Sequence, residues 1–169
     1  MLRLMLFRHG KSDWNADTRG DRDRPLNARG ERAAATMGLV LREMEEVPDL
    51  VVSSPAVRAE TTAAIARISG GWAGRLEIAE ELYGAGPGAA MAVAARCGKD
   101  AERLMLVGHE PTWSLLAQQI TGGRVTVKTA TVLAFDLNAS TWANAGQAAG
   151  SLAFSIHPRM FNGEGWSLR

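Results

Sequence analysis

The sequence predicts an α/β fold, a three-layer sandwich in which helices cover both faces of a mainly parallel central sheet. Two observations predict it. Short apolar runs, typical of buried strands, alternate along the chain with segments whose apolar residues recur at helical spacing. Three of these runs also lead into strand–helix junctions that carry arginine or histidine side chains, at the edge where a parallel sheet binds ligands. At 169 residues the chain can bury a sizeable core, and we expect residues 1–169 to form a single domain.

The first predicted strand is residues 2–7, an apolar run of strand length. A polar, highly charged loop over residues 11–24 follows it, and its alternating charges are typical of a solvated loop with local ion pairs. Asn27 is a good N-cap for the next segment, in which apolar residues recur at helical spacing. Pro48 ends that segment, so we predict a helix between these two residues.

The second predicted strand is residues 50–52. It continues into Ser53-Ser54-Pro55, where a serine N-cap followed by proline predicts the start of a helix. We expect this helix to reach about Ile68, because Gly70 and Gly71 break the pattern.

Residues 76–78 predict a short strand, residues 80–86 a loop, and residues 87–96 an alanine-rich helix. The third strongly apolar strand is residues 104–107, after which Pro111 opens a helix that runs to Ile120. Residues 132–137 and 152–156 predict two further strands, which can pair antiparallel. The connection between them, residues 138–150, is small and polar and predicts a loop.

Composition excludes several classes of protein. The net charge of +1 gives no electrostatic reason to expect nucleic acid or a membrane surface as a partner. Cys97 is the one cysteine, so neither an intramolecular disulfide nor a thiolate metal cluster can form. Arg3 and Arg8 interrupt the apolar N-terminus, which argues against a signal peptide, and no stretch reaches membrane-spanning length. These features predict a cytoplasmic enzyme or binding domain.

Basic and imidazole side chains gather at three predicted strand–helix junctions. Arg8 and His9 follow the first strand, Arg58 follows the second, and His109 follows the third. Because the carboxyl ends of parallel strands meet at one edge of a sheet, we expect these side chains to line one crevice. Arginine forks and helix N-termini suit a multiply charged anion. The sequence therefore predicts a phosphate site.

The chemistry that fits such a site is phosphoryl transfer. A neutral imidazole of His9 can attack phosphorus, while Arg8, Arg58 and His109 hold the equatorial oxygens. The two histidines could instead be metal ligands, but a dication beside two arginines would be repelled and no clear carboxylate set completes the site. We therefore expect no metal ion and no cofactor.

Other features carry less functional information. His157, near the last strand, is interpreted as structural or exposed, and the scattered methionine and tryptophan residues as packing residues. Gly10-Lys11-Ser12 is not a P-loop, because Met5 stands where that motif needs a glycine.

Several motifs, in order, resemble the histidine phosphatase (phosphoglycerate mutase-like) superfamily. Arg8-His9-Gly10 carries the resemblance, together with Leu26, Gly30, Ala33-Ala34, Ser53-Ser54-Pro55, Arg58-Ala59-Glu60-Thr61-Thr62 and Val107-Gly108-His109-Glu110-Pro111. Asp23-Arg24-Pro25-Leu26, Leu82-Tyr83 and the short length are similar to the SixA branch of phosphohistidine phosphatases.

The resemblance implies that His9 is the phosphorylated nucleophile and that Arg8, Arg58 and His109 bind phosphate. Arg24, Glu81 and Gly108 are further candidates for contacts near the phosphate, and phosphate or sulfate is an expected occupant. Many members also carry a carboxylic acid that protonates the leaving group. Glu80 and Glu81 lie near that place in the sequence, but neither aligns securely.

Three functions remain open at this stage. The leading hypothesis is a metal-independent phosphatase for phosphohistidine, because an imidazole leaving group needs less proton assistance than an alkoxide. The expected partner is then a phosphorylated protein. The segment between the helix that carries Arg58 and the third strand is short and leaves few residues to cover the crevice, so an open site would admit a phosphohistidine on a protein. The second hypothesis is a phosphatase or mutase for small phosphorylated metabolites, with Glu80 or Glu81 as the acid. The third is a phosphate-binding domain without turnover.

Overall fold

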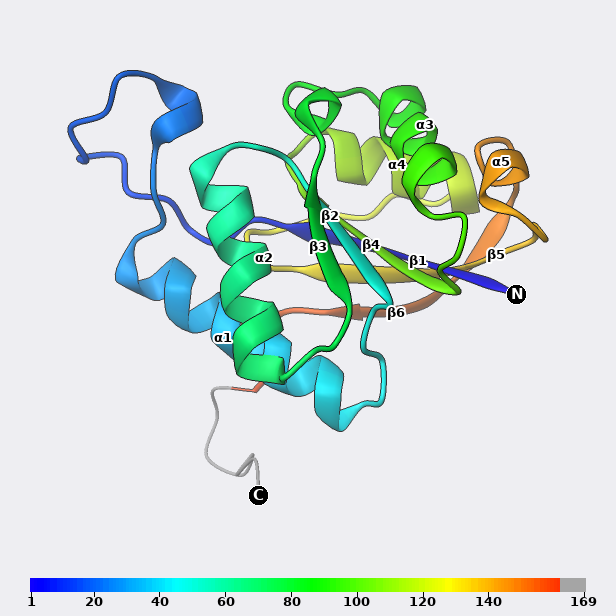
Figure 1. The fold of residues 1–169 in the computed structure, drawn as a ribbon, viewed down its shortest axis with the longest axis horizontal. Coiled ribbons are helices and arrows are strands. Elements are labelled where there is room, and N and C mark those ends of the chain that lie inside the picture. The colour runs from blue at the N-terminus through cyan, green and yellow to red at the C-terminus, as the bar shows by residue number, and fades with distance from the viewer. Residues whose placement is uncertain (162–169) are drawn as a thin grey trace.

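Six strands form one mixed sheet in the order β3-β2-β4-β1-β5-β6 (Figure 1). The computed structural model describes residues 1–161. Strand bounds are β1 Leu2–Arg8, β2 Leu50–Ser53, β3 Arg75–Ile78, β4 Arg103–Gly108, β5 Val132–Leu137 and β6 Gly150–Ile156. The strands β1 to β4 are parallel, whereas β5 runs antiparallel to both β1 and β6. The predicted α/β class, the mainly parallel sheet and the antiparallel last pair are confirmed.

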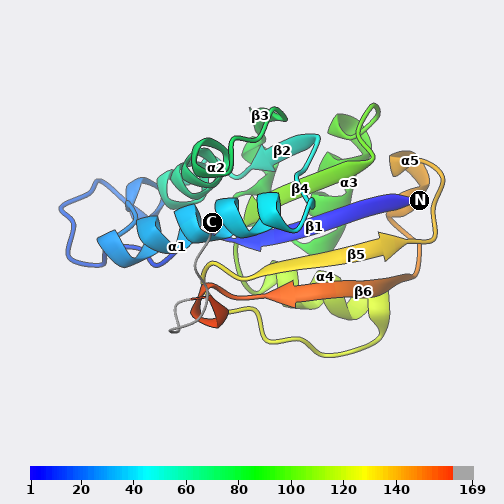
Figure 2. The ribbon, with the colours of Figure 1, turned by 90° about the horizontal axis from the view of Figure 1, so that it is seen from below.

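The helices form a layer on each face of the sheet (Figure 2). On one face, α1 (Ala28–Glu43) packs beside α2 (Val57–Gly70). The other face carries α3 (Pro87–Cys97), α4 (Thr112–Thr121) and the short α5 (Trp142–Ala145). None of the helices within residues 1–161 has the length and apolar character needed to cross a bilayer.

The core consists of two apolar clusters, one on each side of the sheet. Leu4 and Leu6 of β1 pack in the cluster under α3, α4 and α5, whereas Met5 and Phe7 pack in the cluster under α1 and α2. All four side chains are fully buried. A central parallel strand that is buried on both faces needs a continuous apolar run, which is why residues 2–7 were recognisable as a strand.

The predicted start of α2 is wrong in one respect. Its N-cap is Ala56, which makes no side-chain cap, and not a serine. The hydroxyl of Ser54 does accept a hydrogen bond from the Ala56 amide at 3.3 Å, but in a turn that precedes the helix. By contrast, the Asn27 N-cap of α1 is confirmed, because its side chain accepts from the Gly30 amide at 2.9 Å.

Three segments predicted as loops contain helical turns. Residues 138–150 include α5, residues 80–86 include a 3₁₀ turn, η2 (Glu80–Leu82), and residues 11–24 include a 3₁₀ turn, η1 (Asp21–Asp23). Trp142 anchors α5, because its buried indole N–H donates to the carbonyl of Ala101 at 2.7 Å. The turn is thus fixed by a tertiary contact that local sequence does not reveal.

Gly10 and Gly30 let the loop after β1 cross closely over the first turn of α1. A Cβ atom on Gly30 would lie 2.2 Å from the carbonyl oxygen of Lys11, and one on Gly10 would lie 2.7 Å from the carbonyl oxygen of Gly30. Only glycine fits such an approach of two backbones. This crossing holds residues 11–24 over the carboxyl edge of β1.

Candidate active site

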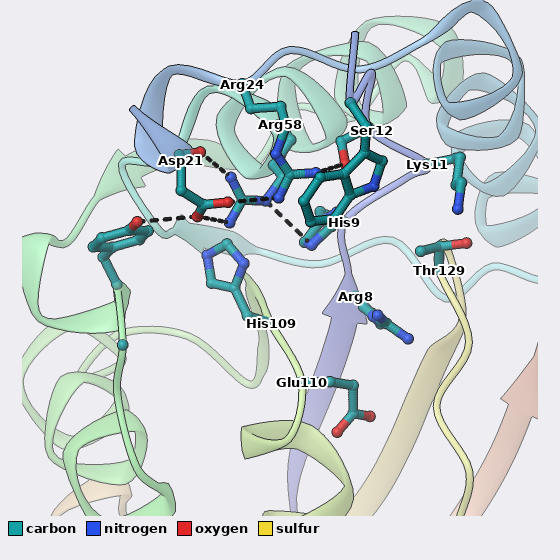
Figure 3. A pocket seen from close by; sticks show the side chains of 13 residues that line it. Arg8, His9, Lys11, Ser12, Asp21, Arg24, Arg58, His109, Glu110 and Thr129 are labelled. Atoms are coloured by element: carbon teal, nitrogen blue, oxygen red, sulfur yellow. Dashed lines mark hydrogen bonds and ion pairs between the residues drawn. The ribbon is translucent and has the colours of Figure 1, made fainter. Parts of the chain in front are cut away.

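A cavity of about 520 Å³ opens at the carboxyl ends of β1 and β4 (Figure 3). Its walls come from the loop after β1, the start of α2, the loop after η2 and the β4–α4 junction. It is lined by Arg8, His9, Lys11, Ser12, Trp14, Asp21, Arg24, Arg58, Tyr83, Gly84, His109, Glu110 and Thr129. The three junctions that the sequence singled out therefore do converge.

His9 is held as a neutral imidazole with a defined tautomer. Its Nδ1 lies 2.7 Å from the carbonyl oxygen of Gly10, and because a carbonyl only accepts, Nδ1 carries the proton. Its Nε2 accepts a hydrogen bond from Nε of Arg58 at 3.3 Å. Burial lowers the pKa of His9 to about 3, with the positive charge of Arg58 and Arg8 contributing. The unprotonated Nε2 is therefore available as a nucleophile.

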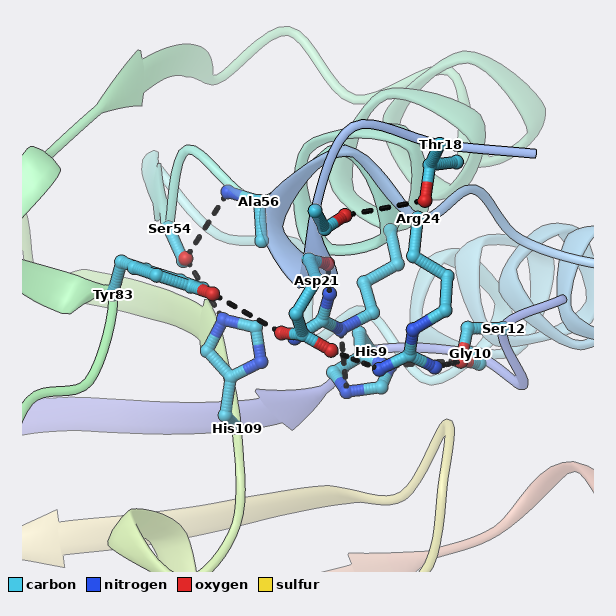
Figure 4. Close-up of polar contacts among 12 residues, drawn as sticks. His9, Gly10, Ser12, Thr18, Asp21, Arg24, Ser54, Ala56, Tyr83 and His109 are labelled. Atoms are coloured by element: carbon cyan, nitrogen blue, oxygen red, sulfur yellow. Dashed lines mark hydrogen bonds and ion pairs between the residues drawn. The ribbon is translucent and has the colours of Figure 1, made fainter. Parts of the chain in front are cut away.

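Asp21 joins the guanidinium groups of two arginines. Arg24 donates to its Oδ1 at 2.6 Å and Arg58 to its Oδ2 at 2.8 Å, while the Tyr83 hydroxyl donates to Oδ2 at 3.1 Å (Figure 4). The hydrogen bond from Arg24 lowers the pKa of Asp21 to about 2, with Arg58 and Tyr83 contributing. An anion thus lies between Arg24 and Arg58, which shows that this part of the cavity favours negative charge.

His109 lies beside His9, with ring centroids 5.1 Å apart. Its Nε2 is 2.8 Å from the hydroxyl oxygen of Ser54, and its Nδ1 has no hydrogen-bond partner within residues 1–161. Burial lowers the pKa of His109 to about 4, and the charge of Arg58 contributes. The pair of neutral imidazoles can thus present one nucleophilic nitrogen and one further polar nitrogen to a ligand.

Arg8 and Arg24 are oriented by different means. Arg8 donates through Nη1 to the carbonyl of Val127 at 2.7 Å, and its buried Nε has no partner within the described part of the chain. Arg24 donates to the hydroxyl of Ser12, and its guanidinium carbon lies 3.6 Å from the centre of the Trp14 ring. Arg24 is thus held between a hydroxyl and an aromatic face.

The structure separates the candidates that the sequence proposed. Arg8, His9, Arg24, Arg58 and His109 all line the cavity. Gly108 does not, and its role is backbone geometry: its carbonyl accepts from the His9 amide at 3.0 Å. A Cβ on Gly108 would lie only 2.7 Å from the Trp113 ring.

Glu80 and Glu81 do not line the cavity. Glu80 is ion-paired with Arg22 at 2.8 Å and Glu81 with Arg96 at 2.9 Å, both on the exposed side of η2. The structure therefore does not place Glu81 near the anion site, and neither glutamate is positioned to protonate a leaving group.

Eight residues of the cavity were not among the sequence candidates: Lys11, Ser12, Trp14, Asp21, Tyr83, Gly84, Glu110 and Thr129. Trp14 was interpreted as a packing residue, but it is 71% exposed and stacks on Arg24; Trp72, Trp113 and Trp142 are buried as predicted, and Trp166 lies outside the described residues. Glu110 follows His109 directly, and its Oε1 is buried without a partner within residues 1–161. That position beside His109 was the one signal that could have identified it.

His157, predicted to be structural or exposed, has a capping role. Its Nδ1 accepts from the Arg159 amide at 3.2 Å at the start of a 3₁₀ turn, η3 (Pro158–Met160). Among residues 1–161, no group of three or more histidine, cysteine or acidic side chains could hold a metal ion.

Comparisons with known proteins identify the family of this chain. A model of the histidine phosphatase superfamily (branch 1) matches residues 4–88. The protein Rv1276c of Mycobacterium tuberculosis, which is uncharacterised, is 42% identical over 111 residues, covering 66% of this chain and 67% of its own length. An uncharacterised chloroplastic protein of Arabidopsis thaliana is 27% identical over 160 residues, covering 85% of this chain and 70% of its own length.

Solved structures of phosphohistidine phosphatases share the fold of this chain. A structure from Nakamurella multipartitia, named for phosphohistidine phosphatase SixA, superposes with a TM-score of 0.78 and 28% identity, covering 93% of this chain and 96% of that one. SixA in complex with tungstate superposes with a TM-score of 0.76 and 19% identity, covering 94% and 99% of the two chains. The latter likeness concerns the fold alone.

Proposed function

Because this chain belongs to the histidine phosphatase superfamily, we propose that it is a metal-independent phosphatase that removes phosphate from phosphohistidine through a covalent intermediate on His9. The observation that carries the proposal is the state of His9. Its Nδ1 holds the proton against the Gly10 carbonyl, so Nε2 carries a lone pair, which accepts from Arg58 within a cavity that Arg8 and His109 also line. A nucleophile in this position needs no base to remove a proton.

The proposed reaction has two steps. In the first, the Nε2 lone pair of His9 forms a bond to phosphorus as the P–N bond of the substrate breaks, and the departing imidazole takes a proton from water. In the second, a water oxygen attacks phosphorus and the P–Nε2 bond breaks. Inorganic phosphate leaves, the proton of the water passes to solvent, and His9 returns to its neutral form.

Arg8, Arg58 and His109 are the proposed ligands of the phosphoryl oxygens, with Arg24 in support. Their charges and N–H groups would stabilise the negative charge that spreads over the equatorial oxygens in the transition state. Arg58 is 5% exposed and donates to Nε2 of His9, so the same side chain can orient the nucleophile and bind the phosphoryl group.

Two observations support phosphohistidine as the substrate. Neither Glu80 nor Glu81 lines the cavity, and an imidazole leaving group is the one that least needs a positioned acid. The 28% identity and close superposition with the Nakamurella SixA structure also support it.

One observation favours a second candidate, the hydrolysis or transfer of small phosphomonoesters. Glu110 places a carboxylate in the cavity wall with one oxygen free of partners within residues 1–161, so it could serve as the acid that Glu81 cannot. Relatives also include phosphoglycerate mutase 1 of Saccharomyces cerevisiae, 41% identical over 68 residues, which covers 39% of this chain.

The test compares metal-free turnover of phosphohistidine and of a simple alkyl phosphomonoester, with His9→Ala as the control. We expect phosphohistidine to be preferred, a phosphoenzyme that is labile to acid and stable to base, and a loss of about 10³-fold or more in His9→Ala. Preference for the ester would favour the second candidate. Phosphate binding without a phosphoenzyme would indicate a binding domain without turnover.

A further inference from the structure

A second cavity, of about 460 Å³, adjoins the first and has a strongly basic wall. The two cavities share Lys11 and Thr129 in their linings, and Figure 3 shows these two side chains next to one another at one edge of the first cavity. The second cavity is lined by Lys11, Arg29, Arg32, Ala33, Thr36, Thr129, His157, Pro158 and Arg159. We call it the basic groove. No acidic side chain of the described residues lines it.

The cations of the groove lack the ion pairs that neutralise other arginines of this chain. Elsewhere in residues 1–161, eight arginines pair with carboxylates and only Arg8, Arg19, Arg67 and Arg124 do not; the eight are Arg3, Arg22, Arg24, Arg42, Arg58, Arg75, Arg96 and Arg103. Within the same residues, the side chains of Lys11, Arg29, Arg32 and Arg159 form no ion pair and no hydrogen bond. A chain with a net charge of only +1 thus concentrates uncompensated positive charge beside its candidate active site.

His157 responds to this positive charge. Burial lowers its pKa, and the charges of Arg159, Lys128 and Arg29 lower it further. The cations that line the groove come from three separate parts of the chain: the loop after β1, α1 and η3. The fold therefore gathers them, rather than one basic stretch of sequence.

The exposure of these cations indicates the size of the ligand. In the first cavity Arg58 is 5% exposed, as expected of a group that encloses a small anion. Lys11, Arg29, Arg32 and Arg159 are all exposed. Exposed, unpaired cations contribute little to the binding free energy of a single small anion in water. They contribute more to the association rate and the orientation of a large partner of opposite charge.

We propose that the basic groove binds an acidic segment of the protein that carries the phosphohistidine. This inference rests on the proposed function and specifies its substrate. The phosphohistidine side chain would enter the first cavity at His9, and acidic residues beside it would lie along α1 and η3, past Lys11 and Thr129. The groove thus provides selectivity for proteins with acidic surroundings, while the first cavity provides the chemistry.

The test uses the full chain and three substrates. They are free phosphohistidine and two phosphohistidine peptides of equal length, one flanked by aspartate and glutamate and the other by asparagine and glutamine. We expect kcat/KM to be about 10-fold higher for the acidic peptide than for the neutral one at low salt, and the difference to fall as salt is raised. Arg29→Glu/Arg32→Glu should abolish the preference, and Arg29→Gln/Arg32→Gln should reduce it.

Arg124→Glu is the matched control. Arg124 is an exposed arginine without an ion pair in residues 1–161, and it follows α4, on the other face of the sheet from α1. This variant should keep the peptide preference, and the Arg29/Arg32 variants should keep their turnover of free phosphohistidine. Arg29, Arg32 and Arg124 are all exposed, so their substitution removes no core contact, and circular dichroism would check that each variant is folded.

The outcomes separate this inference from the function on which it rests. If free phosphohistidine is turned over but the two peptides react equally, the docking inference is overturned and the proposed function stands. If Arg29→Glu/Arg32→Glu slows free phosphohistidine as much as the acidic peptide, the groove serves a small anion and the inference is again overturned. If no phosphohistidine substrate is turned over, the proposed function itself fails.

Discussion

The carboxylate of Asp21 is ion-paired with Arg58 at 2.8 Å, although the two residues lie 37 positions apart. Arg58 is also hydrogen-bonded to Nε2 of His9 and is a proposed phosphate ligand. If Arg58 binds phosphate as proposed, Asp21 competes with phosphate for the same guanidinium group. Arg58 would then exchange a carboxylate partner for phosphoryl oxygens, and Asp21 would set the free-energy cost of that exchange.

Asp21→Asn should bind inorganic phosphate more tightly, with a Kd lower by about 10-fold, because a negative charge beside the anion is removed. Isothermal titration calorimetry would measure it. Asp23→Asn is the control, since Asp23 lies in the same 3₁₀ turn, η1 (Asp21–Asp23), and its side chain forms no hydrogen bond or ion pair within residues 1–161. Weaker binding in Asp21→Asn would mean that Asp21 mainly orients the arginines.

Glu110→Gln should lower turnover of an alkyl phosphomonoester by about 10²-fold if Glu110 acts as the acid of the second candidate function. Turnover of phosphohistidine should change little, since its leaving group needs no such acid. Glu81→Gln is the matched control, because Glu81 is paired with Arg96 outside the cavity. An equal loss in both glutamate variants would argue against a specific role for Glu110.

Stability should fall as the pH drops below about 6.5, the unfolded pKa of histidine. The folded-state pKa is depressed to about 3 for His9 and about 4 for His109, so the unfolded chain binds protons that the folded chain does not. Stability is thus fully present above 6.5 and is lost toward these folded values, by up to about 1.4 kcal/mol per pH unit for each group.

Urea unfolding between pH 7 and pH 4.5 would measure this loss. His9→Asn should flatten the pH dependence relative to the unsubstituted chain. An unchanged slope in this variant would show that other groups, such as carboxylates, cause the acid sensitivity.

Gly30→Ala should destabilise the fold by about 2 kcal/mol or more, because its Cβ would lie 2.2 Å from the Lys11 carbonyl oxygen, which cannot move without shifting the loop over the site. Turnover should fall with it. Gly20→Ala is the control, since a Cβ there meets nothing within 4 Å. Chemical denaturation of both variants would test this, and equal stabilities would contradict the close crossing of loop and helix.

Much of the fold was predictable because its signals are local. The apolar runs of β1, β2 and β4 and the Asn27 cap each depend on a few adjacent residues. The start of α2 and the existence of α5 were not predictable from local sequence. The Ser54 hydroxyl is hydrogen-bonded to His109, and α5 depends on the hydrogen bond from Trp142 to the Ala101 carbonyl.

The sequence by itself determined that Arg8, His9, Arg58 and His109 share one edge of the sheet. Strand polarity brings the carboxyl ends of parallel strands together, whatever the loops do. Only the tertiary structure decided which acidic residues join them. Asp13, Asp17, Asp21 and Asp23 are alike as members of one charged loop, and Glu80 and Glu81 appear as suitable as Glu110. Where a loop side chain lies depends on how the loop crosses other elements, and here the crossing at Gly10 and Gly30 accompanies the placement of Asp21 between Arg24 and Arg58.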